Sequence, residues 1–120
     1  MAKHLFILNS GPEDPCRATA AFLTAKALVE KGDEVVIWLY NQAVYLAVEG
    51  TPSEVQAPGL PPFEDLLLFL TKTHNTPIYI GVSCAAGRGL VDVQGNPIIK
   101  FCCGELANPA KLAELIKESD

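Results

Sequence analysis

Three short runs of consecutive apolar residues, each followed by a segment of helical character, limit the folds open to this chain. The runs occupy residues 4–9, 34–40 and 77–83, and they lack the strict alternation of apolar and polar residues typical of a half-exposed strand. Strands that are apolar on both sides are typical of parallel sheets covered by helices on both faces. We therefore expect an α/β fold, a three-layer sandwich with a mostly parallel sheet of four to five strands.

Helix signals separate these runs. Asp14 fits an N-cap, Pro15 suits the first helical position, and Gly32 suits the turn after the last, so a helix is predicted at about 15–31. The remaining elements are expected to be a short helix at 41–48, a long loop at 49–62, a helix at 63–73 and a fourth strand at 98–103. Asn108 is expected to cap a last helix, on which Leu112, Leu115 and Ile116 form an apolar stripe.

The helix predicted at 63–73 contains five large apolar residues in succession, Leu66 to Leu70. At 100° per residue, five successive side chains surround the helix, whereas a surface helix normally keeps one polar face. A deeply buried helix in a monomer would explain the pattern. Burial by the sheet on one side and by a neighbouring subunit on the other would explain it equally, and in so small a domain we expect the homo-oligomer.

Bulk composition narrows the functional classes. A chain of 120 residues is long enough for one domain with a real core, and we expect a single domain over residues 1–120. The net charge of −5, with no run of lysines or arginines, argues against nucleic-acid binding. No apolar stretch has membrane-spanning length and no signal-peptide pattern is present, which predicts a cytoplasmic protein without membrane contact. Its four cysteines are then expected to be reduced.

Cys84 is the first candidate for chemistry. It follows the predicted strand 77–83 and precedes a glycine-flanked turn or short helix, where free backbone N–H groups favour thiolate over thiol. Arg88 lies four residues further on, so in a helix it would share the face of Cys84 and its charge would favour the thiolate further. Packing as a small apolar residue is the alternative for Cys84, and a solvated surface position is the alternative for Arg88.

The other cysteines are weighed in the same way. Cys16 falls in the first turn of the helix after the first strand, and it is a candidate second reactive thiol. Cys102 and Cys103 would close the strand 98–103, where neighbouring side chains point to opposite faces, so core packing is the expected role. In a parallel sheet all four thiols would gather near the carboxyl edge.

The two histidines restrict the chemistry further. His4 and His74 stand at the beginnings of strands, so we expect them at the edge of the sheet opposite Cys84. A Cys-His nucleophile pair and a Cys₂His₂ zinc site both require contact between these groups, and neither is expected. No C-x₂-C spacing and no nucleotide-binding glycine motif is present, so the sequence implies neither a metal nor an organic cofactor.

The order and spacing of several motifs resemble the DsrE/DsrF-like (YchN-like) family. The motifs are Leu8-Asn-Ser-Gly-Pro-Glu-Asp-Pro15, Arg17-Ala-Thr-Ala-Ala-Phe-Leu23, Lys31-Gly-Asp-Glu-Val-Val36, and Ile78-Tyr-Ile-Gly-Val82 followed by Cys84 and Arg88-Gly-Leu90. This resemblance spans nearly the whole chain and implies a YchN-like fold that assembles into trimers or hexamers. It also implies sulfur relay in some members, with persulfide carried on the cysteine that corresponds to Cys84.

Three functions follow as hypotheses. The first is a cytoplasmic sulfur carrier, or sulfurtransferase-like protein, that holds persulfide on Cys84 between donor and acceptor proteins. The second is peroxiredoxin-like thiol redox chemistry with Cys84 and Cys16 as a pair, which requires Cα atoms within about 7 Å of each other. The third is a non-catalytic oligomeric module that binds a small ligand near the 49–62 loop and the sheet edge.

Overall fold

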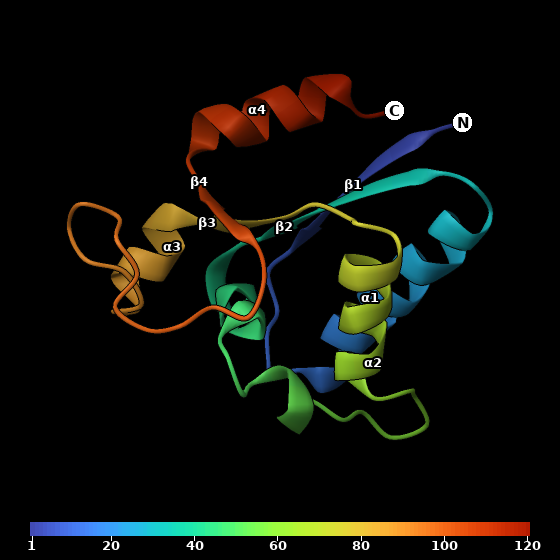
Figure 1. Cartoon of the computed structure of the whole chain (residues 1–120), viewed down its shortest axis with the longest axis horizontal. Coiled ribbons are helices and arrows are strands. Elements are labelled where there is room, and N and C mark those ends of the chain that lie inside the picture. The colour runs from blue at the N-terminus through green and yellow to red at the C-terminus, as the bar shows by residue number, and fades with distance from the viewer.

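A computed structural model describes all 120 residues of the chain (Figure 1). Its elements, in chain order, are β1 (Lys3–Leu8), α1 (Pro15–Glu30), β2 (Glu34–Leu39), the 3₁₀ helices η1 (Asn41–Ala47) and η2 (Pro52–Glu54), α2 (Phe63–Leu68), the π-helical turn η3 (Phe69–Thr73), β3 (Ile78–Gly81), α3 (Val82–Gly87), β4 (Glu105–Ala107) and α4 (Pro109–Glu118).

The four strands form one sheet in the order β1-β2-β3-β4, and every neighbouring pair is parallel. The register places Phe6 beside Ile37, Ile37 beside Ile78, and Tyr79 beside Glu105. The predicted α/β fold with a parallel sheet is therefore confirmed. All four strands end at the same edge of the sheet, which is the edge where parallel α/β proteins bind their ligands.

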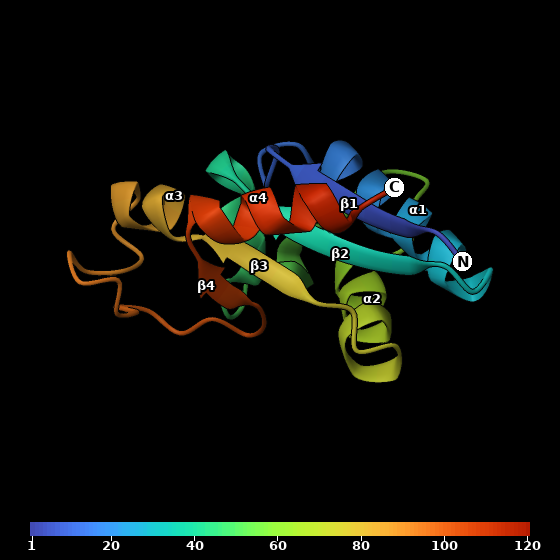
Figure 2. The same ribbon diagram turned by 90° about the horizontal axis from the view of Figure 1, so that it is seen from above.

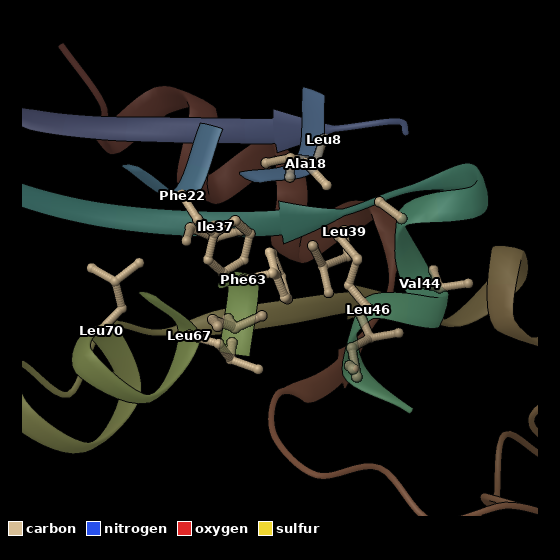
Figure 3. Packing of buried hydrophobic residues seen from close by; sticks show 14 of the residues in the cluster. Leu8, Ala18, Phe22, Ile37, Leu39, Val44, Leu46, Phe63, Leu67 and Leu70 are labelled. Atoms are coloured by element: carbon tan, nitrogen blue, oxygen red, sulfur yellow. The ribbon is translucent and has the colours of Figure 1, made fainter. Parts of the chain in front are cut away.

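One face of the sheet holds the main core. The side chains of β2 alternate between the two faces, and Val35, Ile37 and Leu39 belong to this core. Figure 3 shows Ile37 and Leu39 packed with residues of α1, α2 and η1. Phe22 of α1 meets Phe63 of α2 with ring centroids 4.6 Å apart, and both are fully buried. Burial of each such side chain contributes about 1.5–3 kcal/mol, so this face supplies most of the apolar stabilisation.

The opposite face is covered by α4 alone. Val36 and Trp38 of β2 form a second small cluster with Leu115 of α4, so β2 is buried on both sides (Figure 2). This arrangement explains why the β2 sequence is apolar without alternation. Leu115 is the one buried residue of α4, and Ile116, which was predicted to belong to the same stripe, is largely exposed.

Local signals set the ends of α1 as predicted. The Asp14 side chain accepts a hydrogen bond from the backbone N–H of Arg17 at 3.1 Å, and Pro15 occupies the first helical position. At the other end, Gly32 adopts a φ of +93°, a left-handed conformation that a residue with a Cβ rarely takes. The chain can thus turn directly from α1 into β2.

The predicted helix at 63–73 exists, but its last turn is a π-helix. Leu66, Leu67 and Leu70 are buried, Phe69 is half-buried, and Leu68 remains 47% exposed. The chain itself therefore covers most, but not all, of the circumference of this helix.

The strand predicted at 98–103 was wrong. Within this segment Phe101 makes only an isolated antiparallel bridge to Val48, beside η1. The fourth strand is instead Glu105–Ala107, which lies at the edge of the sheet and is at most half-buried, so it lacks the continuous apolar signature. Gly104, with a φ of +88°, turns the chain into it.

Candidate functional site

The carboxyl edge of the sheet brings together residues from the ends of β2 and β3. The predicted strand 77–83 ends at Gly81, and Val82 and Ser83 begin α3, so Cys84 lies in the first turn of that helix. Its thiol is half-buried, and none of the three cavities of the molecule is lined by it. Cys84 is therefore a partly open position on the surface rather than the wall of an enclosed pocket.

The sulfur of Cys84 accepts a hydrogen bond from the backbone N–H of Asn41, with an N···S distance of 3.2 Å. Asn41 directly follows Tyr40, the residue that leaves β2, and its φ of 51° lies in the left-handed region. Asparagine is one of the few residues other than glycine that adopts this conformation readily. A donor aimed at sulfur stabilises the negative charge of a thiolate.

Hydrogen bonds of Arg88 connect α3 to the segment that contains Asn41. Its guanidinium donates to Gln42 Oε1 at 2.7 Å, to the Cys84 carbonyl oxygen at 3.2 Å, and to Asn41 Oδ1. No hydrogen bond joins the guanidinium to the Cys84 sulfur. Arg88 lies beside Cys84, as expected. It acts on the Cys84 sulfur only indirectly, because it orients Asn41, whose N–H contacts that sulfur. We call these four residues, Cys84, Asn41, Gln42 and Arg88, the Cys84 site.

Gly11 adds the loop after β1 to the same edge. A Cβ at this position would lie 2.1 Å from the carbonyl oxygen of Gln42, so only glycine permits this approach. The backbone N–H of Gly11 is held by the Glu13 carboxylate at 2.9 Å. The loops after three adjacent strands thus meet at the Cys84 site.

The sequence alone did not reveal Asn41, Gln42 or Gly11 as parts of the site. The available signal was positional, because residues 40–42 directly follow the strand beside β3, and the ends of neighbouring parallel strands meet. The left-handed backbone of Asn41 and the hydrogen bonds of Arg88 depend on contacts between distant segments, which periodicity does not encode.

Cys16 is exposed in the first turn of α1, and no hydrogen bond connects its thiol to Cys84. The histidines lie at the opposite edge, as predicted. His4 Nε2 contacts the Asp33 carboxylate at 2.9 Å, and this hydrogen bond holds the pKa of Asp33 below its usual value. The largest cavity, of about 430 Å³, is also at that edge and includes Asp33 and His74, so it is remote from the candidate thiol.

The vicinal cysteines differ most from expectation. Because 98–103 is not a strand, Cys102 and Cys103 do not point to opposite faces, and their sulfurs lie 3.9 Å apart beside one cavity. Cys102 is exposed, whereas Cys103 is half-buried and packs against the core. Burial, together with the neighbouring Cys102, raises the pKa of Cys103 to about 12. Core packing thus describes Cys103 but not Cys102.

A half-open thiol at the carboxyl edge of a small parallel sheet, contacted by a backbone N–H, defines a small α/β thiol protein. The chain belongs to the DsrE/DsrF-like family, a family of sulfur-relay proteins. The similarity to this family extends over residues 2–120. The fold is similar to that of the YchN protein of E. coli, with a TM-score of 0.78 and 23% identity over 100% of this chain and 96% of that one. No match was found among curated proteins.

These comparisons confirm the resemblance to the family and the YchN-like architecture. At 23% identity, the likeness to YchN concerns the fold. No helix of the structure has both the length and the apolar character needed to cross a bilayer. No group of three or more histidine, cysteine, aspartate or glutamate side chains is arranged to hold a metal ion.

Proposed function

We propose that the chain is a sulfur carrier in which Cys84 holds sulfane sulfur as a persulfide between a donor protein and an acceptor protein. The observation that carries this proposal is the hydrogen bond from the Asn41 N–H to the Cys84 sulfur at 3.2 Å. This donor stabilises negative charge on sulfur, both in the thiolate that attacks and in the persulfide anion that forms. Family membership supports the same chemistry.

The chemistry requires two thiol exchanges. The Cys84 thiolate attacks the terminal sulfur of a donor persulfide, so a new S–S bond forms on Cys84, the donor S–S bond breaks, and the donor leaves as a thiolate. An acceptor thiolate then attacks the terminal sulfur on Cys84 and regenerates the Cys84 thiolate. Each step exchanges one S–S bond for another, so no external oxidant or reductant is needed.

The surroundings of Cys84 suit protein partners. The thiol is partly open and lines no cavity, which allows a cysteine on another protein to approach it. An enzyme that acts on a free small molecule would normally enclose it in a pocket. The four free cysteines also fit the reducing cytoplasm, which we propose as the location.

Sulfur loading and discharge test the proposal. The reduced protein is treated with a persulfide donor, freed of the donor, weighed by mass spectrometry, and then mixed with an acceptor protein that has one exposed cysteine. We expect a gain of one sulfur atom that maps to Cys84 and passes to the acceptor. Cys84→Ser should not load at that position, whereas Cys16→Ser, the matched control, should behave as wild type. Loading that persists unchanged in Cys84→Ser would refute the proposal.

We also propose that the chain assembles as a homo-oligomer, a trimer or a hexamer. Leu68 supports this proposal because it is 47% exposed on a helix whose other leucines are buried. Sedimentation of the wild type and of Leu68→Glu provides the test. A wild-type protein that sediments as a monomer would contradict it.

A further inference from the structure

Cys102 and Cys103 form a pair of thiols that the proposed sulfur relay does not use. Their sulfurs lie 3.9 Å apart, and both residues line a cavity of about 260 Å³. Residues of α2 and η3, among them Leu67, Thr71 and Lys72, also line this cavity. The two thiols therefore form a local cluster beside a cavity that the Cys84 site does not share.

The backbone that leads into the pair is held by contacts with η1 and the residues after it. The Cys102 N–H donates to the Ala47 carbonyl oxygen at 2.8 Å, and the Glu49 N–H donates to the Lys100 carbonyl oxygen at 2.9 Å. Between them, Phe101 bridges Val48. The main chain is thus held up to Cys102, and the two sulfurs already lie 3.9 Å apart, so side-chain rotation can bring both onto a shared atom.

The donor set limits what that shared atom can be. Structural zinc requires four ligands, and no group of three or more histidine, cysteine, aspartate or glutamate side chains is arranged here to hold an ion. A divalent cation bound by this pair would also require two adjacent thiolates, and Cys103 is half-buried. The pair instead suits a trivalent element that forms covalent bonds to both sulfurs and keeps one substituent of its own.

We propose that Cys102 and Cys103 form a dithiol site for trivalent arsenic compounds, either arsenous acid or a singly substituted organoarsenical. Each thiol S–H is replaced by an S–As bond, each hydroxyl lost from arsenic leaves with that hydrogen as water, and arsenic remains trivalent. Nothing is oxidised or reduced, and the dithioarsenite leaves no net charge in the cavity. The exposed Cys102 binds first, and Cys103 then closes the chelate ring.

Phenylarsine oxide is the probe for this site. In the reduced full-length double variant Cys16→Ser/Cys84→Ser, only the vicinal thiols remain. We expect one phenylarsenic group per chain, a mass gain of that group less two hydrogens, and an adduct that resists a small monothiol but is removed by a small dithiol. Two linked contacts typically raise affinity by about 10²–10⁴-fold, so loss of either thiol should weaken binding by at least about 100-fold.

The variants that decide the matter are Cys102→Ser and Cys103→Ala in the same background. Cys102 is exposed, so its replacement by serine should leave the melting temperature unchanged. Equal affinity in either variant would overturn the proposal, as would removal of the adduct by the monothiol. An adduct that forms only in a cross-linked dimer would show that each arsenic joins thiols of two chains, which would overturn it as well. Because Cys84 is absent, the result is independent of sulfur relay.

Discussion

Asn41 and Cys84 are separated by 43 residues in the chain, yet the backbone N–H of Asn41 lies 3.2 Å from the Cys84 sulfur. The contact exists because β2 and β3 are neighbours and end at the same edge of the sheet. Asn41 leaves β2 in a left-handed conformation, with a φ of 51°, and its side chain accepts a hydrogen bond from Arg88. The geometry at one sulfur thus depends on one unusual backbone position.

Substitution of Asn41 separates the backbone from the side chain. Asn41→Gly keeps the N–H and permits a φ of 51°, so sulfur uptake by Cys84 should remain within a few-fold of wild type. Asn41→Val is strained there by about 1–3 kcal/mol and should displace the N–H. Because a hydrogen bond to a charged group contributes about 1.5–3 kcal/mol, uptake should fall at least about tenfold, as followed by mass spectrometry. Equal rates in the two variants would show that this N–H has no role.

Gly11 tests whether the loop after β1 supports the site. A Cβ at position 11 would lie 2.1 Å from the Gln42 carbonyl oxygen, so Gly11→Ala must displace the segment that carries Asn41. We expect a loss of about 1–3 kcal/mol of unfolding free energy and slower uptake at Cys84. Gly87→Ala is the matched control, because a Cβ there meets nothing within 4 Å. Urea unfolding and uptake rates measure both effects, and a Gly11→Ala protein as stable as Gly87→Ala would contradict the account.

The elements that local signals determine were predictable from the sequence. Asp14, Pro15 and Gly32 mark α1 through capping and backbone preference, and the apolar run of β2 reflects burial on both faces. β4 was missed because an edge strand of three residues, half-exposed to solvent, carries no continuous apolar pattern. Residues 98–103 carry that pattern, but they pack beside η1.

The candidate site was predictable only in part. The position of Cys84 after β3 followed from the strand pattern, whereas the roles of Asn41 and Gln42 depend on which strands are neighbours. The prediction failed for the vicinal cysteines. A strand at 98–103 would place Cys102 and Cys103 on opposite faces, but this segment is not a strand, and their sulfurs lie close together. A local pattern thus locates a reactive residue more readily than its partners.

The contact between His4 and Asp33, at the edge of the sheet opposite Cys84, should make a contribution to stability that is lost in acid. The hydrogen bond from His4 lowers the pKa of Asp33, so the ionised carboxylate is favoured in the folded state. A group with a depressed folded-state pKa stabilises the fold above its unfolded pKa, and this contribution disappears as pH falls through the folded value. Urea unfolding should therefore show wild type more stable than Asp33→Asn at about pH 6, with the difference shrinking towards about pH 3. A difference that does not change with pH would contradict this explanation.

The third layer depends on Leu115. This residue alone is buried on α4, and it packs in one cluster with Val36 and Trp38. Leu115→Ala should lower the unfolding free energy by about 2–5 kcal/mol, as measured by urea titration. Ile116→Ala, at a position 53% exposed, should change it by less than about 0.5 kcal/mol. Equal effects of the two substitutions would show that α4 does not dock through Leu115.

Sulfur uptake by four variants that each retain a single cysteine tests the central claim most directly. Each reduced variant is treated with the same persulfide donor, and the initial rate at which it gains one sulfur atom is read by mass spectrometry. We predict that the variant retaining Cys84 loads fastest, and faster than the variant retaining the more exposed Cys16, because only the Cys84 sulfur receives a backbone N–H from Asn41. Uptake at Cys84 that is no faster than at Cys16 would contradict the account.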